Sequence, residues 1–227
     1  MTDVQEKVKD ISSYTSKLLR KKFGRGPESC MATLSEKFLL LHIRGFVSPM
    51  EEVLLLQGKY QDVDNARTVI IANVLEELKG VVQVSLNVEV TEFYHDWNFP
   101  NNTGVIILIL SGNCPQLSVG KSAIIPKFEK EIARISELVQ KVPDEIVTII
   151  HSEKVIVVKR DGILIPIEKA LIKRGFEKEL IITKDELEKE YFHRFGKFGD
   201  ILSCKVKDIF IDWDLKEDKS LMVFILQ

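Results

Sequence analysis

The amino-acid sequence contains one long stretch twice, and this repeat restricts the possible folds more than any other feature. Residues 85–110 align without a gap with residues 201–226, a shift of 116 positions (201 − 85). Both copies carry an Asp-Trp pair in the same place, followed by a polar loop and an apolar run: Asp96-Trp97 and Asp212-Trp213. Because self-similarity at a fixed period is typical of a duplicated structural unit, we expect two units of the same design.

The first unit opens with apolar residues three or four positions apart, which predict a helix over residues 4–19. Short apolar runs at residues 29–34 and 38–44 predict a hairpin. Next, Ser48-Pro49-Met50-Glu51 combines the hydroxyl, proline and glutamate of a capping box, which predicts the start of another helix.

That helix is expected to break at Gly58, and its second piece is expected to end at Gly80. A long strand from residue 85 to Asp96-Trp97, a loop over residues 98–104 and a return strand complete the first unit. The second unit repeats this order. Its predicted elements are a helix at 125–141, a hairpin at 145–160, a helix that starts at Pro166, and a helix that starts with a capping box at Thr183 and ends at Gly196.

This element order predicts an α+β protein of two tandem α-β-β-α-β-β repeats, each an antiparallel four-stranded sheet covered by helices. The expected bounds are 1–115 for the first repeat, 116–121 for a linker and 122–227 for the second repeat. A short linker between similar units suggests pseudo-twofold packing, as in a fused homodimer, so we expect a pseudo-symmetric monomer or a dimer.

Composition excludes some partners and compartments. The 227 residues carry a net charge of −2, which gives no reason to expect binding to nucleic acid. The three cysteines Cys30, Cys114 and Cys204 lie far apart and lack C-x-x-C spacing, so neither disulfides nor a zinc site is expected. With no apolar run of about 18 residues and a polar start, the sequence predicts a soluble cytoplasmic protein without a transmembrane segment.

The first unit contains motifs that resemble those of a known family. They are Phe23-Gly24-Arg25-Gly26-Pro27, Arg44-Gly45 and the segment Ser48-Pro49-Met50-Glu51. Together they resemble the MpsC-like domain family, named after a Na+-translocating membrane-potential-generating system. The second copy is divergent, because Lys141-Val142-Pro143-Asp144 stands where Gly-Arg-Gly-Pro would be expected.

The resemblance implies a soluble bacterial protein associated with membrane systems that handle ions or inorganic carbon, without an established catalytic role. We therefore expect a non-enzymatic accessory or regulatory binding protein, with contacts to a membrane transport complex. No cofactor and no metal ion are expected, since the four histidines show neither helical i, i+4 pairing nor a Cys/His cluster, and no nucleophile or P-loop motif is present.

The loop Gly24-Arg25-Gly26-Pro27 offers an alternative function. Glycines allow backbone N–H groups to approach a ligand, and Lys21, Lys22 and Arg25 add positive charge, as in a small-anion or nucleotide sensor. A helix end with solvated cations explains the same residues without a ligand.

Three further polar residues are candidates for ligand binding: His42, Arg44 and His95. His42 and Arg44 share one face of a strand, where exposed polar residues are also common without a function. His95 lies next to Asp96, but neighbouring strand residues point to opposite faces, which argues against a catalytic dyad. At the two Asp-Trp corners we expect the aspartate to bind backbone groups of the following loop and the tryptophan to close the core.

Overall fold

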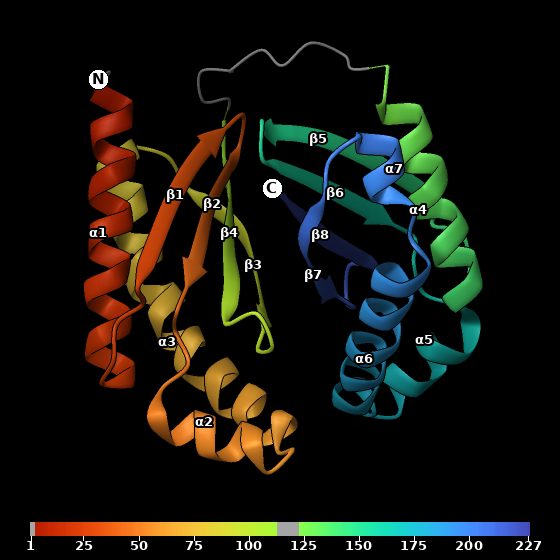
Figure 1. Ribbon diagram of the computed structural model, residues 1–227, viewed down its shortest axis with the longest axis horizontal. Helices are drawn as coiled ribbons and strands as arrows, with labels where there is room; N and C mark the ends of the chain where they lie inside the picture. Colours follow the sequence, from red (N-terminus) through yellow and green to blue (C-terminus); the bar gives the residue numbers. More distant parts are fainter. Residues whose placement is uncertain (1–2, 113–122) are drawn as a thin grey trace. The chain divides into compact units, whose positions relative to one another are not determined.

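The computed structural model describes residues 3–112 and 123–227, and each of these ranges forms one compact unit (Figure 1). Each unit contains a four-stranded antiparallel sheet with helices. The predicted α+β class and the tandem helix-strand-strand-helix-strand-strand order are therefore confirmed. The predicted linker, residues 116–121, lies outside the described residues, and the pseudo-twofold relation stays a prediction.

The first unit contains three helices and four strands among its described residues. They are α1 (Asp3–Phe23), β1 (Ser29–Ser35), β2 (Phe38–Arg44), α2 (Pro49–Leu56), α3 (Tyr60–Leu86), β3 (Val90–Asn98) and β4 (Thr103–Leu110). The strand order is β1-β2-β4-β3, with every neighbouring pair antiparallel. Two hairpins are thus joined side by side through β2 and β4.

The second unit has the same sheet, with the order β5-β6-β8-β7. Its elements are α4 (Ile125–Val139), β5 (Glu145–Ser152), β6 (Val155–Asp161), α5 (Pro166–Lys173), α6 (Glu177–Phe195), α7 (Phe198–Leu202), β7 (Val206–Asp214) and β8 (Lys219–Leu226). The pair α6 and α7 corresponds to the single helix α3, because Gly196 interrupts the second copy.

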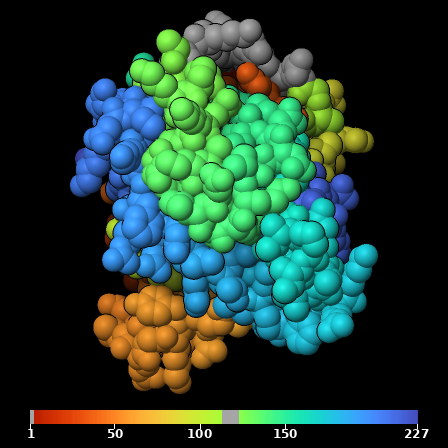
Figure 2. All heavy atoms as spheres, turned by 90° about the vertical axis from the view of Figure 1, so that its right-hand side faces the viewer, coloured from red at the N-terminus to blue at the C-terminus, as the bar shows by residue number. Residues whose placement is uncertain are grey.

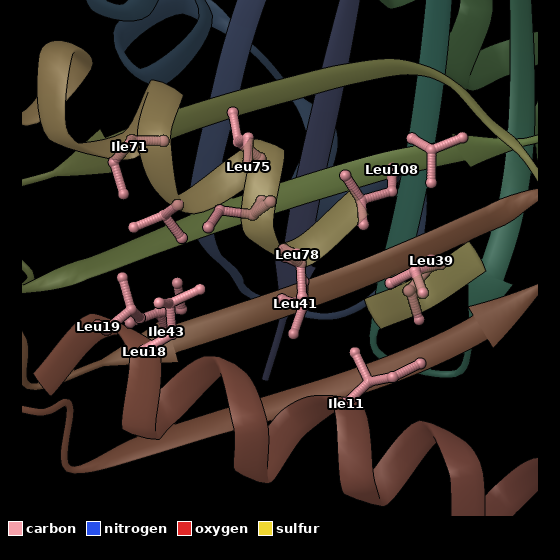
Figure 3. Packing of buried hydrophobic residues seen from close by; sticks show 14 of the residues in the cluster. Ile11, Leu18, Leu19, Leu39, Leu41, Ile43, Ile71, Leu75, Leu78 and Leu108 are labelled. Carbon is pink, nitrogen blue, oxygen red and sulfur yellow. The ribbon is translucent and has the colours of Figure 1, made fainter. Parts of the chain in front are cut away.

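The core of each unit lies between the sheet and its long helices. In the first unit, Figure 3 shows side chains of α1 and α3 meeting alternate residues of β2 and β4, which point to the same face of the sheet. The labelled core residues are Ile11, Leu18, Leu19, Leu39, Leu41, Ile43, Ile71, Leu75, Leu78 and Leu108. Burial of this apolar surface is the main favourable term in folding.

The predicted helix end at Gly80 is wrong, because α3 continues to Leu86. Glycine inside a helix costs about 1 kcal/mol relative to alanine, but the next turn places Val82 in the core, where it is fully buried. Burial of a valine side chain is worth about 1.5–3 kcal/mol, which outweighs that cost. Asn87, in the left-handed region with φ 54°, follows the helix end, so the next strand begins at Val90 instead of residue 85.

The helix start predicted at Thr183 is also wrong. Helix α6 begins at Glu177, and the Thr183 hydroxyl donates a hydrogen bond to the Glu179 carbonyl 2.8 Å away, one turn earlier in the same helix. A threonine hydroxyl can be satisfied in this way without capping a helix. The preceding turn is held by Leu180, which is buried in the second core.

Gly104 is expected to tolerate no side chain. It lies opposite Trp97 in the β3–β4 ladder, and a Cβ atom at this position would overlap the Trp97 ring. We expect Gly104→Ala to lower the free energy of unfolding by about 1–3 kcal/mol, as overpacking of a core does. The matched control is Gly80→Ala, where a Cβ meets open space within a helix, and it should stabilise by about 0.5–1 kcal/mol. Urea unfolding measures both, and equal effects would contradict the packing argument.

Candidate functional site

The turn from β2 into α2 is fixed by hydrogen bonds to the β3–β4 loop. Gly45 adopts φ 65°, and its N–H donates to the Asn102 carbonyl at 2.9 Å. The Asn102 side-chain oxygen accepts from the backbone N–H groups of Phe46 at 2.7 Å and Val47 at 2.9 Å. The start of α2 is thereby held at one end of the sheet.

The capping box predicted from the sequence is present at this helix start. Ser48 Oγ accepts from the Glu51 N–H at 3.4 Å, and Glu51 Oε2 accepts from the Ser48 N–H at 2.7 Å. Because its carboxylate reaches back to the cap, Glu51 points inward, and it is the one buried residue of α2.

A buried ion pair joins α2 to α3. Arg67 Nε lies 2.7 Å from Glu51 Oε1, its Nη2 lies 3.0 Å from Glu51 Oε2, and Nη2 also donates to the Phe46 carbonyl at 2.7 Å. Burial raises the pKa of Glu51, but the hydrogen bonds and positive charge of Arg67 outweigh it and hold that pKa below its usual value. The carboxylate therefore stays ionised in the interior.

Four aromatic rings surround the same guanidinium. The Arg67 Cζ atom lies 4.5–5.9 Å from the ring centroids of Phe23, Phe46, Trp97 and Phe99. Contacts of this kind are favourable because the ring face carries partial negative charge. We call this set, together with Glu51 and Arg67, the arginine cluster. It connects the end of α1, the β2–α2 turn, α3, β3 and the β3–β4 loop.

Sequence reasoning missed Arg67, although a signal was available. It lies four residues after Val63 and four before Ile71, on the helix stripe that faces the core, and all three side chains are buried. An arginine on such a stripe needs a buried anion. The nearest capping-box glutamate, Glu51, was the candidate.

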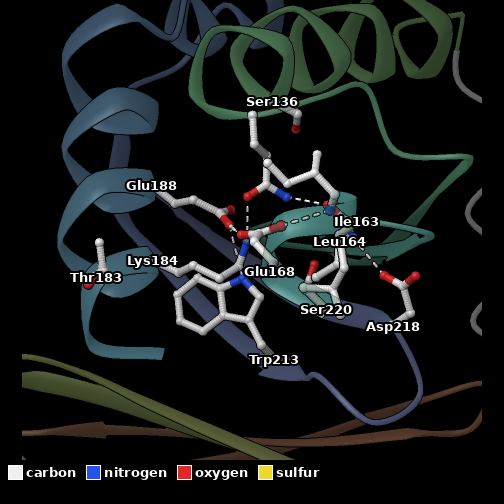
Figure 4. Close-up of polar contacts among 12 residues, drawn as sticks. Ser136, Ile163, Leu164, Glu168, Thr183, Lys184, Glu188, Trp213, Asp218 and Ser220 are labelled. Atoms are coloured by element: carbon white, nitrogen blue, oxygen red, sulfur yellow. Dashed lines mark hydrogen bonds and ion pairs between the residues drawn. The ribbon is translucent and has the colours of Figure 1, made fainter. Parts of the chain in front are cut away.

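The second unit contains a remodelled version of this site, shown in Figure 4. A shift of 117 positions places Glu168 on Glu51 (168 − 51) and Lys184 on Arg67 (184 − 67). Lys184 Nζ lies 3.2 Å from Glu168 Oε1, and Glu168 Oε2 accepts from the Ile165 N–H at 2.9 Å. The carboxylate thus has the same two roles in both repeats.

A second ion pair is added in this unit alone. Arg160 Nη2 lies 2.6 Å from Glu188 Oε2, while Glu188 Oε1 accepts from Lys184 Nζ and from Trp213 Nε1, both at 3.1 Å. Burial raises the pKa of Glu188, but the charges and hydrogen bonds of Arg160 and Lys184 lower it by more. The pKa therefore lies below its usual value. We call these residues, together with Glu168, the charge cluster.

The predicted ligand-binding loop lies at the end of α1. Gly24 has φ 73° and open space around it, and Lys21 and Arg25 are exposed. Lys22 forms an ion pair with Glu77 of α3, and the Arg20 side chain lies against Gly26. Arg44, also exposed, pairs with Ser29 at the start of β1, and the Glu28 N–H donates to the Gly45 carbonyl at 3.3 Å. Arg44 and the loop therefore lie at the same end of the sheet.

The two candidate histidines lie on opposite faces of the first sheet. His42 pairs with Val105, the residue that also faces Asp96, whereas His95 pairs with Ile106 on the core face. The structure thus brings neither His42 to His95 nor His95 to Asp96. Within residues 3–112 and 123–227, no group of three or more His, Cys, Asp or Glu side chains is placed to hold a metal ion.

Both Asp-Trp corners show the same local contact. Asp96 Oδ1 accepts from the Trp97 N–H at 2.6 Å, and Asp212 Oδ1 accepts from the Trp213 N–H at 2.8 Å. Each indole is buried in the core of its own unit. These aspartates bind the backbone of the strand itself, one residue ahead.

The protein is thus a duplicated α+β domain protein. In each repeat, a glutamate in the first turn of a short helix pairs with a buried cation of the next helix. Residues 4–112 and 121–227 each match the family described as Na+-translocating membrane potential-generating system (MpsC), so the chain belongs to this family and contains two copies of its domain. No curated protein and no solved structure matches the chain. None of the described helices is long and apolar enough to span a bilayer.

The ion pair predicts a pH-dependent contribution to stability. Glu51→Gln leaves Arg67 buried without an anion and is expected to lower the free energy of unfolding by about 3–5 kcal/mol near neutral pH. Since the Glu51 pKa is lowered in the folded state, this contribution is present above about pH 4.3, the usual glutamate pKa, and is lost as pH falls through the folded value.

Urea unfolding of both proteins between about pH 7 and pH 2 measures this difference. The control is Glu52→Gln, an exposed neighbour in the same helix turn, which is expected to change stability by less than about 0.5 kcal/mol. A stability gap for Glu51→Gln that persists unchanged to the lowest pH would contradict the assignment.

Proposed function

We propose that the protein is a non-enzymatic accessory or regulatory component of a bacterial system that generates membrane potential or handles inorganic carbon. It works in the cytoplasm and binds a membrane-embedded protein of that system. Two findings support the proposal: the family match of both repeats, and apolar side chains exposed on the short helix that follows the second strand of each repeat.

The exposed apolar residues lie on and beside the corresponding short helix of each unit, and Met50 and Ile167 occupy the same position in the repeat. On and just after α2 they are Met50, Val53, Leu56 and Tyr60, and on and just after α5 they are Ile167, Leu171 and Phe176. Leu56 is 83% exposed, and Met50 and its counterpart Ile167 are 75% and 65% exposed. In Figure 2, the α2 atoms (orange) and the α5 atoms (cyan) are both at the surface. Apolar groups kept in water in both copies are typical of a protein-binding surface.

The charges beside these residues narrow the chemistry of the partner. Helix α2 carries Glu52 at the surface and no cation, whereas α5 carries Lys173 and is followed by Arg174. Lys169 of α5 already pairs with Asp218 at 2.7 Å. We therefore propose apolar partner surfaces with cations beside the α2 contact and anions beside the α5 contact, since complementary charge around an interface fixes the register.

Removal of the α2 apolar side chains tests this function. From native cells opened with little detergent, the tagged protein is expected to copurify with a membrane complex, and Met50→Ser with Leu56→Ser should reduce recovery of that complex at least about tenfold, as loss of central apolar anchors does. Val69→Ser with Val84→Ser is the control, because both residues are exposed on α3. Recovery of the wild-type protein alone would refute the proposal.

A second candidate function is a small-anion or nucleotide sensor that uses the loop Gly24–Pro27. It is favoured by the positive φ of Gly24 with open space around it and by the exposed cations Lys21, Arg25 and Arg44 at the same end of the sheet. The ion pair between Lys22 and Glu77 leaves this lysine already engaged.

A thermal-shift panel of phosphate, bicarbonate and nucleotides tests the sensor. A ligand at 100 times its Kd stabilises the folded state by about 2.7 kcal/mol, which for this chain length is a rise of roughly 5–10 °C in Tm. Arg25→Ala should abolish the shift, while Lys9→Ala, at an exposed position of α1, should keep it. If no compound raises the wild-type Tm, the sensor function is excluded.

A further inference from the structure

Four buried positions at the centre of each core have changed together between the two repeats. The shift between the repeats is 117 positions up to the long helix and 116 after it, because the second repeat is one residue shorter in that helix. It pairs Leu19 with Ser136, Ile43 with Arg160, Ile71 with Glu188, and Gly104 with Ser220. In each repeat these residues come from the first helix, the second strand, the long helix and the last strand.

In the first unit this set is apolar. Leu19, Ile43 and Ile71 are fully buried in one cluster, and Gly104 leaves room for the Trp97 ring. The apolar set therefore contains no buried donor or acceptor on a side chain that needs a partner.

In the second unit the same four positions form a hydrogen-bonded network. Arg160 donates to Ser220 Oγ at 2.8 Å and to Ser136 Oγ at 3.3 Å, and its pair with Glu188 completes the guanidinium contacts. Arg160 and Glu188 are each 2% exposed. A buried ion pair of this kind is tolerated because each charge has its partner.

We propose that this difference decides which long helix covers which sheet. The repeats share element order and sheet topology, so α3 and α6 would otherwise compete for both sheets during folding. On the first sheet, Glu188 of α6 would keep Lys184 of its own helix, but it would meet Ile43 where its own unit supplies Arg160. On the second sheet, Ile71 of α3 would leave Arg160 buried without an anion. The first exchange takes one of two cations away from a buried carboxylate, and the second leaves a buried guanidinium without an anion. Both changes are destabilising.

The outer ion pair cannot supply this selectivity. Glu51 with Arg67 and Glu168 with Lys184 have the same signs at matching positions. A helix moved to the other sheet would therefore still present a cation to a glutamate. Arg160 and Glu188 are the charges that distinguish the two sheets.

Single substitutions in the full chain reproduce each mismatch. Glu188→Ile places the first repeat's residue over Arg160, and Ile71→Glu places the second repeat's residue over Ile43. Each is expected to lower the Tm of its unit by roughly 12–40 °C in scanning calorimetry. In the second unit, Glu188→Ile combined with Arg160→Ile, Ser136→Leu and Ser220→Gly restores a matched set and should recover most of that loss.

A helix exchange tests the selectivity directly. Residues 60–78 are replaced by the sequence of residues 177–195, so that the α6 sequence, including its glutamate, faces the first sheet. We expect this chimera to lose the transition of the first unit, and Ile in place of that glutamate should restore it. The proposal is overturned if this isoleucine does not raise the Tm of the chimera, or if the matched fourfold variant is no more stable than Glu188→Ile alone.

Discussion

The buried contact between Glu51 and Arg67 is the interaction on which the first unit depends. One carboxylate caps α2 and binds the arginine of α3, while the guanidinium also reaches a turn carbonyl and four aromatic rings. Removal of either charge would leave the other in a medium of low dielectric, where an unpaired ion is costly. The contact therefore fixes the position of α2 relative to α3 and the sheet, within one unit.

The same contact explains why α2 exposes apolar side chains. Because Glu51 occupies the inward side of a short helix, Met50, Val53 and Leu56 point away from the core. The second unit repeats this arrangement with Glu168 inward and Ile167 outward. An inward charge and an outward apolar surface are thus two consequences of one capping box, and the proposed partner-binding surface follows from the internal ion pair.

The two repeats differ most at the centre of the core, and they keep the same frame around it. The capping-box glutamate, its cation and the Asp-Trp corner occur in both, whereas the centre of the core is apolar in one and charged in the other. Such a change is possible because the four substitutions compensate one another. Both halves match the MpsC family, and the residues that they have in common belong to this frame and not to the core centre.

The hairpins, the start of α2 and the order of the elements could be predicted from the sequence, because each depends on residues near one another in the chain. The duplication could be predicted too, because it appears as a repeat at a fixed period. The sequence did not determine the end of α3 or the start of α6, where buried Val82 and Leu180 override a glycine and a threonine. Nor did it pair Arg67 with Glu51, 16 positions apart, or Arg160 with Glu188, 28 positions apart. Those outcomes were decided by the tertiary structure, since burial and charge pairing depend on segments that become neighbours only when the sheet and helices pack.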